Sequence, residues 1–425
     1  MNISSMNNYT TESRLFFIAR WQEKLEQLIL LCFSVFPLTT LFQSMSIFGA
    51  INQLLIVVLV FLLLAYALIT RIDKGVWLAL LIMAANSLIN FAVTKPPYVS
   101  VNMIVYLPVW CLMFTYFAYM KEKIGKRFEQ VQTPIFVICV IWSLVVAVSA
   151  AFPSSYYVED TWGSTRYFAS ITGNVFRLEP SAAAALILLA VLARLGKYDR
   201  KALALMSLVP LYCAFFGGSR TYLVVIAVLY VVFLRQLIQD KGKFRAILGV
   251  GAALFVVAVL STSIGDKILN GLNTSAWYVT DPLAQLTSGR SEFWAIDMRE
   301  YFAMPLHQQL FGSGFNEIFE INLREYGRDL WGHNDFVNLL ITNGLTGVIL
   351  YLYFAFRCVL AYAGDWRGAK WILVTLVIFA WLFNAFFNMA YTYMCSAIAF
   401  AIALTTCSMS SRPTTMRQPK TLEDR

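Results

Sequence analysis

Four short segments of this chain carry side chains suited to anion binding or proton transfer. They are Phe176-Arg177-Leu178-Glu179-Pro180, Gly217-Gly218-Ser219-Arg220, Ser288-Gly289-Arg290 and Trp331-Gly332-His333-Asn334-Asp335. Guanidinium groups bind phosphate oxygens in bidentate fashion, so Arg177, Arg220 and Arg290 are candidate ligands for a phosphorylated substrate. Histidine titrates near neutral pH, so His333 is the first candidate for a base and Glu179 is the second.

The elements that position these residues are membrane helices. The chain is 59% hydrophobic and 13% charged, with a mean hydropathy of +0.65 over 425 residues. A bilayer core of roughly 30 Å needs about 20 apolar residues per helix. Such runs predict an all-α polytopic fold with about twelve spans, near 26–43, 50–70, 75–93, 101–120, 134–152, 180–194, 202–217, 220–236, 246–262, 336–357, 370–387 and 389–408.

Charge placement gives the expected orientation. With twelve spans, 24 of the 33 Lys and Arg residues fall on the side that holds both termini. Positive residues collect on the cytoplasmic side, which predicts that both termini face the cytoplasm and that the long loop lies on the outer side of the membrane. The net charge of +9 is thus explained by short cytoplasmic turns, and no nucleic acid partner is expected.

The predicted organisation has four parts. Residues 1–262 form a transmembrane bundle of about nine helices, 263–335 an extracytoplasmic catalytic loop, 336–410 further transmembrane helices, and 411–425 a cytoplasmic tail. The loop holds five Lys or Arg and ten Asp or Glu, a net charge of −5, so an arginine kept there is not explained by topology. Gly312 and Gly314 are expected to shape a turn in it. Pro180 suits the first turn of the sixth span.

Polar side chains at the outer ends of spans fit a lipid-linked diphosphate. Arginines at headgroup depth would neutralise a pyrophosphate leaving group, and His333 would take the proton of an incoming sugar hydroxyl. No metal site and no cofactor is predicted, although Glu325, Asp329 and Asp335 remain open as metal ligands. The seven cysteines lie in or at the ends of spans, and no P-loop or HExxH pattern occurs.

Simpler roles for the same residues stay open. Arg220 could be a headgroup anchor, and Arg290 could pair with Glu292 or Asp297. Glu179 could be a helix N-terminal carboxylate that satisfies the helix dipole.

Several motifs resemble the O-antigen ligase and polymerase superfamily. They are Gly-Gly-Ser-Arg opening a span, Ser-Gly-Arg-x-x-x-Trp, Phe-Gly-x-Gly-Phe at 311–315, and His-Asn-Asp-Phe-x-x-x-Leu-x-x-x-Gly-x-x-Gly at 333–347. The resemblance implies an inverting, metal-independent membrane glycosyltransferase acting on undecaprenyl-diphosphate-linked glycans. Arg220 and Arg290 would bind the diphosphate, and His333 would activate the acceptor.

Two activities compete within that superfamily. The run Arg-Leu-Glu-Pro-Ser at 177–181 is similar to a feature of polymerases, with one residue missing between Arg and Glu, and it favours polymerisation of repeat units into O-antigen, capsule or exopolysaccharide. The alternative is a ligase of lipopolysaccharide biosynthesis that transfers the polymer to a lipid A core. From another class, a secondary transporter or a lipid-linked sugar flippase also fits twelve spans. Expected partners are the lipid-linked glycan, membrane lipid and a chain-length regulator.

Overall fold

The computed structural model describes residues 3–95, 101–159, 165–261, 265, 284, 287, 289–327, 329–363 and 369–409. Within these residues the chain is almost entirely α-helical, apart from one antiparallel hairpin of β1 (Tyr156–Glu159) and β2 (Thr165–Phe168). The helices are α1 (Ile3–Leu41), α2 (Ser46–Ile69), α3 (Lys74–Val93), α4 (Val101–Met120), α5 (Ile124–Ser149), α6 (Val175–Leu195), α7 (Arg200–Phe216), α8 (Arg220–Leu237), α9 (Lys241–Leu260), α12 (Arg290–Ala303), α13 (Leu306–Phe311), α14 (Glu317–Tyr326), α15 (Asp335–Ala363), α16 (Ala369–Phe387) and α17 (Met394–Ser408).

Each predicted span corresponds to one of these helices. In the described part of the chain, nine helices are long and apolar enough to cross a membrane. The helices α4 and α17 contain shorter apolar stretches, and α7 has 17 residues. The predicted all-α polytopic membrane fold is therefore confirmed. The number of helices that cross the bilayer stays a prediction.

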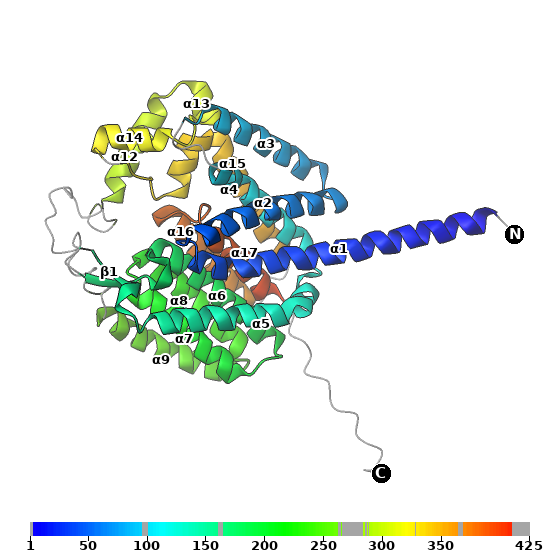
Figure 1. Cartoon of the computed structure of the whole chain (residues 1–425), viewed down its shortest axis with the longest axis horizontal. Helices are drawn as coiled ribbons and strands as arrows, with labels where there is room; N and C mark the ends of the chain where they lie inside the picture. Colours follow the sequence, from blue (N-terminus) through cyan, green and yellow to red (C-terminus); the bar gives the residue numbers. More distant parts are fainter. Residues whose placement is uncertain are drawn as a thin grey trace, which may run out of the picture.

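Helix α6 forms the centre of the bundle. It packs against α8, α17, α7, α1 and α5. Its buried run Ala182 to Ala185 presents only methyl groups, which lets neighbouring backbones approach closely, as is common between membrane helices. In Figure 1 α6 lies among α5, α7, α8 and α17, and the start of α1 projects away from the bundle.

The start of α6 differs from the prediction. The helix begins at Val175, because the side chain of Asn174 caps it by accepting the N–H of Phe176 at 2.8 Å. Pro180 therefore lies inside the helix, beyond the first turn, and the expectation for this residue was wrong. The earlier start also places Glu179 one turn into the helix, where it is fully buried.

Helix α15 is broken at Gly344, which has a φ of 69° and a ψ of −174°. A Cβ at this position would lie 2.4 Å from the carbonyl carbon of Leu310, so only glycine fits. Backbone groups freed by the break are bonded by α3: the Asn86 amide donates to the carbonyl oxygens of Phe311 at 3.1 Å and Asn343 at 2.9 Å. The break thus joins α13, α15 and α3.

The polar elements gather at one end of the bundle. Val93, at the end of α3, lies next to Gly314, whereas Asp73, just before α3, pairs with Arg357 at 2.6 Å. These two contacts are separated by the length of α3, so the segment with Gly314 and the Asp73–Arg357 pair mark opposite ends. Figure 1 shows β1, α12 and α14 on the side away from the projecting start of α1.

Candidate functional site

Arg220 is the first residue of α8, and a tight glycine turn places it there. Gly218 has a φ of +89°, and a Cβ on it would lie 2.2 Å from the ring of Tyr167. Ser219 is the N-cap, and its hydroxyl accepts the N–H of Tyr222 at 3.3 Å. The N-terminus of α8, which is the positive end of the helix dipole, therefore lies at Arg220.

Glu179 stabilises this glycine turn. Its Oε1 accepts the backbone N–H of Ser219 at 3.0 Å, and a Cβ on Gly217 would lie 2.5 Å from the same oxygen. The sequence left open that Glu179 is a carboxylate at a helix N-terminus. The structure shows this role, but Glu179 bonds to the N-terminus of α8 and not to that of its own helix, α6. The bond from Ser219 thus occupies one carboxylate oxygen of Glu179, the second candidate base.

Arg290 is the first residue of α12 and follows Gly289, which has a φ of +80°. Its Nη1 donates to the carbonyl oxygen of Phe387 at the end of α16. Burial and the nearby charge of Arg220 lower the pKa of Arg290 to about 10. Two guanidinium groups therefore lie close together, each at the start of a helix.

Neither of the expected alternative partners of Arg290 pairs with it. Glu292 accepts the hydroxyl of Tyr326 at 2.5 Å, and Asp297 is fully buried behind α12. No ion pair between Arg290 and either carboxylate occurs in the described part of the chain. Its positive charge is thus not balanced by a neighbouring acid there.

His333 sits on a strained turn, with a φ of 49°. The turn is held on both sides: the Trp294 indole donates to the carbonyl oxygen of Gly332 at 2.6 Å, and the Gly332 N–H donates to Asn338 Oδ1 at 3.2 Å. Asn334 then caps α15 by accepting the N–H groups of the two residues that follow Asp335, at 2.9 and 3.1 Å. Such strain persists only where surrounding contacts over-determine it, as at positioned functional groups.

The imidazole of His333 is neutral in this environment. Burial and the charge of Arg290 lower its pKa to about 3. The ordinary titration near neutral pH expected from the sequence was therefore wrong for the unliganded protein, because the neighbouring cation and the loss of water both disfavour a second positive charge. Its ring centroid lies 6.2 Å from that of Phe176, which places it beside the start of α6.

Arg177 and Tyr393 complete the group. Burial raises the pKa of Tyr393, and the charges of both Arg290 and Arg177 act on this phenol in the opposite direction. Arg177 also interacts electrostatically with Tyr106 of α4. The structure therefore brings Arg177 and Arg290 to one phenol and places Arg220 and His333 within reach of the Arg290 charge, although the four residues are far apart in the sequence.

Asp335 binds the segment between α16 and α17, which contains Tyr393. The carboxyl is fully buried, and its Oδ2 accepts the Tyr351 hydroxyl at 2.7 Å and the N–H groups of Ala390 and Tyr391 at 3.1 and 3.2 Å. It therefore fixes the segment between α16 and α17 against the start of α15.

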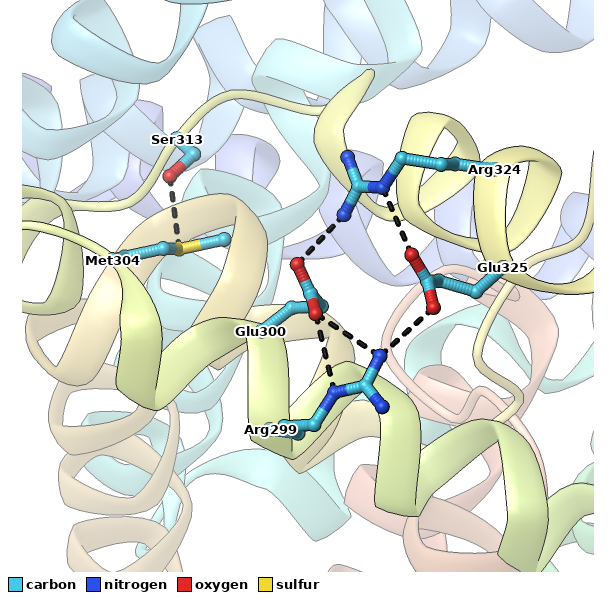
Figure 2. Close-up of polar contacts among 6 residues, drawn as sticks. All are labelled: Arg299, Glu300, Met304, Ser313, Arg324 and Glu325. Carbon is cyan, nitrogen blue, oxygen red and sulfur yellow. Dashed lines mark hydrogen bonds and ion pairs between the residues drawn. The ribbon is translucent and has the colours of Figure 1, made fainter.

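Glu325 belongs to an exposed ring of ion pairs. Arg299 and Glu300 of α12 alternate with Arg324 and Glu325 of α14, at distances from 2.7 to 3.2 Å (Figure 2). The ring ties α12 to α14 on their outer side. Among the residues that the structure describes, no group of three or more His, Cys, Asp or Glu side chains is placed to hold a metal ion.

Gly312 and Gly314 form the turn between α13 and α14. Both have a positive φ, of +93° and +96°. A Cβ on Gly312 would lie 2.0 Å from the carbonyl oxygen of Thr342, and one on Gly314 would lie 3.0 Å from Val93. The pair lets the backbone pass between α3 and the broken part of α15.

The sequence reading missed Tyr106, Tyr393 and Asp297. Tyrosines are common in this chain, with 21 in all, so neither tyrosine carried a signal of its own. Asp297 was considered only as a partner of Arg290. Its spacing from Trp294 and Arg290 on a predicted helix was the one available indication of a shared face.

The fold and the site define a polytopic helical membrane protein with a cluster of arginines at one end of its bundle. Residues 202–352 match the family model described as O-Antigen ligase, a segment that runs from α7 into α15 and includes Arg220, Arg290 and His333. The match supports the resemblance to the O-antigen ligase and polymerase superfamily that the motifs indicate. No curated protein and no solved structure matches it.

Proposed function

We propose that this protein is a membrane glycosyltransferase that polymerises undecaprenyl-diphosphate-linked repeat units. The observation that carries the proposal is a chain of interacting charges at one end of the bundle: Arg177 and Arg290 both act on the Tyr393 phenol, and Arg290 also interacts with Arg220. Two of these arginines begin helices, so both guanidinium charge and helix dipoles favour an anion between them. A diphosphate on a lipid carrier is an anion that reaches a membrane helix end from the bilayer.

In the proposed reaction the acceptor sugar hydroxyl attacks the anomeric carbon of the growing glycan. The bond from that carbon to the phosphate oxygen breaks, and the electron pair leaves with the lipid diphosphate, whose developing charge the arginines stabilise. The hydroxyl proton passes to His333. Attack on the face opposite the leaving group inverts the anomeric centre. Protein cations supply the electrostatic stabilisation, and the proposal invokes no metal and no cofactor.

Substrate binding also makes His333 a better base. In the unliganded site the charge of Arg290 disfavours the imidazolium. A bound diphosphate cancels that charge and adds negative charge nearby, which raises the pKa of the imidazole. Proton uptake is therefore coupled to occupation of the arginine cluster.

A ligase is the second candidate, because the matched family model is described as O-Antigen ligase. Both activities use the same donor diphosphate and differ in the acceptor. Reconstitution in vesicles with lipid-linked repeat units, with and without lipid A core, separates them. Longer lipid-linked chains support the polymerase, and core-attached glycan supports the ligase. Movement of the lipid-linked sugar across the vesicle membrane with neither product would support the flippase instead.

We also propose that the end bearing the site faces away from the cytoplasm, with 263–335 as the catalytic loop and 411–425 as a cytoplasmic tail in the inner membrane. His307→Cys tests this orientation, because His307 is exposed and every native cysteine is buried. An impermeant thiol reagent added to intact cells should label this variant. Labelling only after permeabilisation would contradict the orientation.

A further inference from the structure

Behind the His333 turn lies a buried carboxyl group that the proposed reaction does not use. Asp297 is on α12, about two helical turns after Arg290. It is 0% exposed, and neither carboxyl oxygen has a hydrogen-bond partner among the described residues. A buried acid without a cation is uncommon, because burying an unpaired charge is costly.

The carboxyl group lies against the backbone of the residue before His333. A Cβ built on Gly332 would lie 3.2 Å from Asp297 Oδ2 and 2.9 Å from Asn338 Oδ1. The same Gly332 is bonded by Trp294, which is on the same helix as Asp297. The carboxyl group therefore packs directly beside the backbone of the turn.

Two buried amides flank the carboxyl with complementary free atoms. The Asn322 Nδ2 donates to two backbone carbonyl oxygens, at 3.0 and 3.2 Å, which leaves its Oδ1 as an acceptor without a partner. The Asn338 Oδ1 accepts the Gly332 N–H, which leaves its Nδ2 as a donor without a partner. A neutral carboxylic acid offers one donor and further acceptor capacity, whereas a carboxylate offers acceptors only. The neutral acid therefore matches this pocket.

The charged groups around Asp297 are all engaged elsewhere. Burial raises the pKa of Asp297 to about 7, with a smaller opposing effect of Asn322. Within the described residues, none of the ionisable groups on the helices packed against Asp297 forms a hydrogen bond or ion pair with it. Arg299, Glu300, Arg324 and Glu325 belong to the exposed ring (Figure 2), Glu292 pairs with Tyr326, Glu320 with Lys95, and Asp335 with Tyr351. Tyr301 and Arg290 each donate to a backbone carbonyl oxygen, and Glu317 lies near Glu320.

We propose that Asp297 is a positioning residue that holds the His333 turn in place while it carries a proton, and that its ionisation releases the turn. The neutral acid closes the polar pocket between α12, α14 and α15. An ionised carboxylate would lie fully buried in a site without a balancing cation, where the Asn322 side chain offsets only part of the cost of burial. The expected consequence is a turn that is ordered at neutral and lower pH and loosened at higher pH.

The stability of the substrate-free protein tests the first half of the proposal. Between the unfolded pKa of Asp, 3.8, and the folded value of about 7, the native state binds more protons than the unfolded state, so stability falls as pH rises and then levels off. Asp297→Asn keeps a donor and an acceptor but cannot ionise. Its melting midpoint should therefore rise relative to wild type across that window and stay higher above it. A constant difference at all pH values would overturn the proposal.

The catalytic half rests on the proposed function and uses the same variants. Glycan transfer by wild type should fall above about pH 7, whereas Asp297→Asn should remain active there. Asp297→Ala should lose about a hundredfold at every pH through misplacement of His333. Glu300→Gln, on the exposed face of the same helix, should keep the wild-type profile. An alkaline loss that persists in Asp297→Asn would contradict the proposal.

The two experiments separate this inference from the proposed function. If wild type transfers no glycan, the proposed function fails, and the melting series still decides the role of Asp297. Hydrogen exchange of the peptide 329–335 adds a local measurement. The wild-type peptide should lose protection relative to Asp297→Asn above about pH 7, and equal protection in both proteins would contradict release of the turn.

Discussion

The indole N–H of Trp294 donates to the carbonyl oxygen of Gly332 at 2.6 Å. Through this bond the helix that begins with Arg290 is tied to the turn that carries His333. Arg290, proposed to bind the diphosphate, and His333, the proposed base, are therefore held in one rigid unit, although they are far apart in the sequence. Preorganisation of this kind is how a site stabilises charge that develops in a transition state.

Removing this bond should weaken catalysis more than folding. Trp294→Phe keeps an aromatic ring against Phe386 and Phe387 but leaves the Gly332 carbonyl without its donor. We expect glycan transfer to fall about tenfold or more, because small displacements of a catalytic group are costly. The control is Trp371→Phe, since Trp371 is exposed on the bundle surface. Equal activity of the two variants would show that the bond does not position His333.

The pH dependence of the stability of the unliganded protein should show the contribution of His333. Its folded pKa of about 3 lies below the ordinary value of 6.5. As pH falls through that window the unfolded state takes up a proton that the native state does not, so His333 contributes a loss of stability toward low pH. His333→Asn should show a shallower decline of the melting midpoint between about pH 6.5 and 4.

The exposed His307 provides a matched control, because these are the two histidines of the chain. His307→Asn should decline in parallel with wild type. Parallel curves for all three proteins would mean that His333 is not shielded from protonation in the native state.

The break in α15 should accept no side chain at Gly344. Gly344→Ala places a Cβ against the backbone of Leu310 at a φ of 69°. We expect a large fall in the amount of folded protein, because both strain and a backbone clash must be relieved. Gly249→Ala in α9 is the matched control, since a Cβ there meets no atom within 4 Å. Fluorescence-detected gel filtration of both variants measures the effect, and normal yield of Gly344→Ala would contradict the break.

The helices were predictable because each apolar run is long and continuous. Runs such as 50–70 and 75–93 correspond to α2 and α3 within a few residues. The break at Gly344 was not predictable by the same rule, because the run 336–357 around it is apolar enough to be taken as one continuous span. Gly344 is strained by contacts with α13, and such contacts depend on tertiary packing that no local pattern records.

The site was only partly predictable for a related reason. Arg220 and Arg290 stood out because glycine precedes each of them within a helix-opening motif. Nothing in the sequence showed that their charges act on one another, or that the charges of Arg290 and Arg177 both act on Tyr393. His333 was identifiable by its motif, but its expected pKa was wrong because burial and the charge of Arg290 appear only after folding.

The most direct test of the arginine cluster is binding of an undecaprenyl-diphosphate oligosaccharide to the protein in lipid nanodiscs. Arg290→Gln removes a guanidinium at the start of α12, and Arg299→Gln removes one from the exposed face of the same helix. Arg290→Gln should weaken binding about tenfold to a hundredfold, the loss typical of a hydrogen-bonded charge, while Arg299→Gln should bind as wild type does. Equal affinity of Arg290→Gln and wild type would contradict the account.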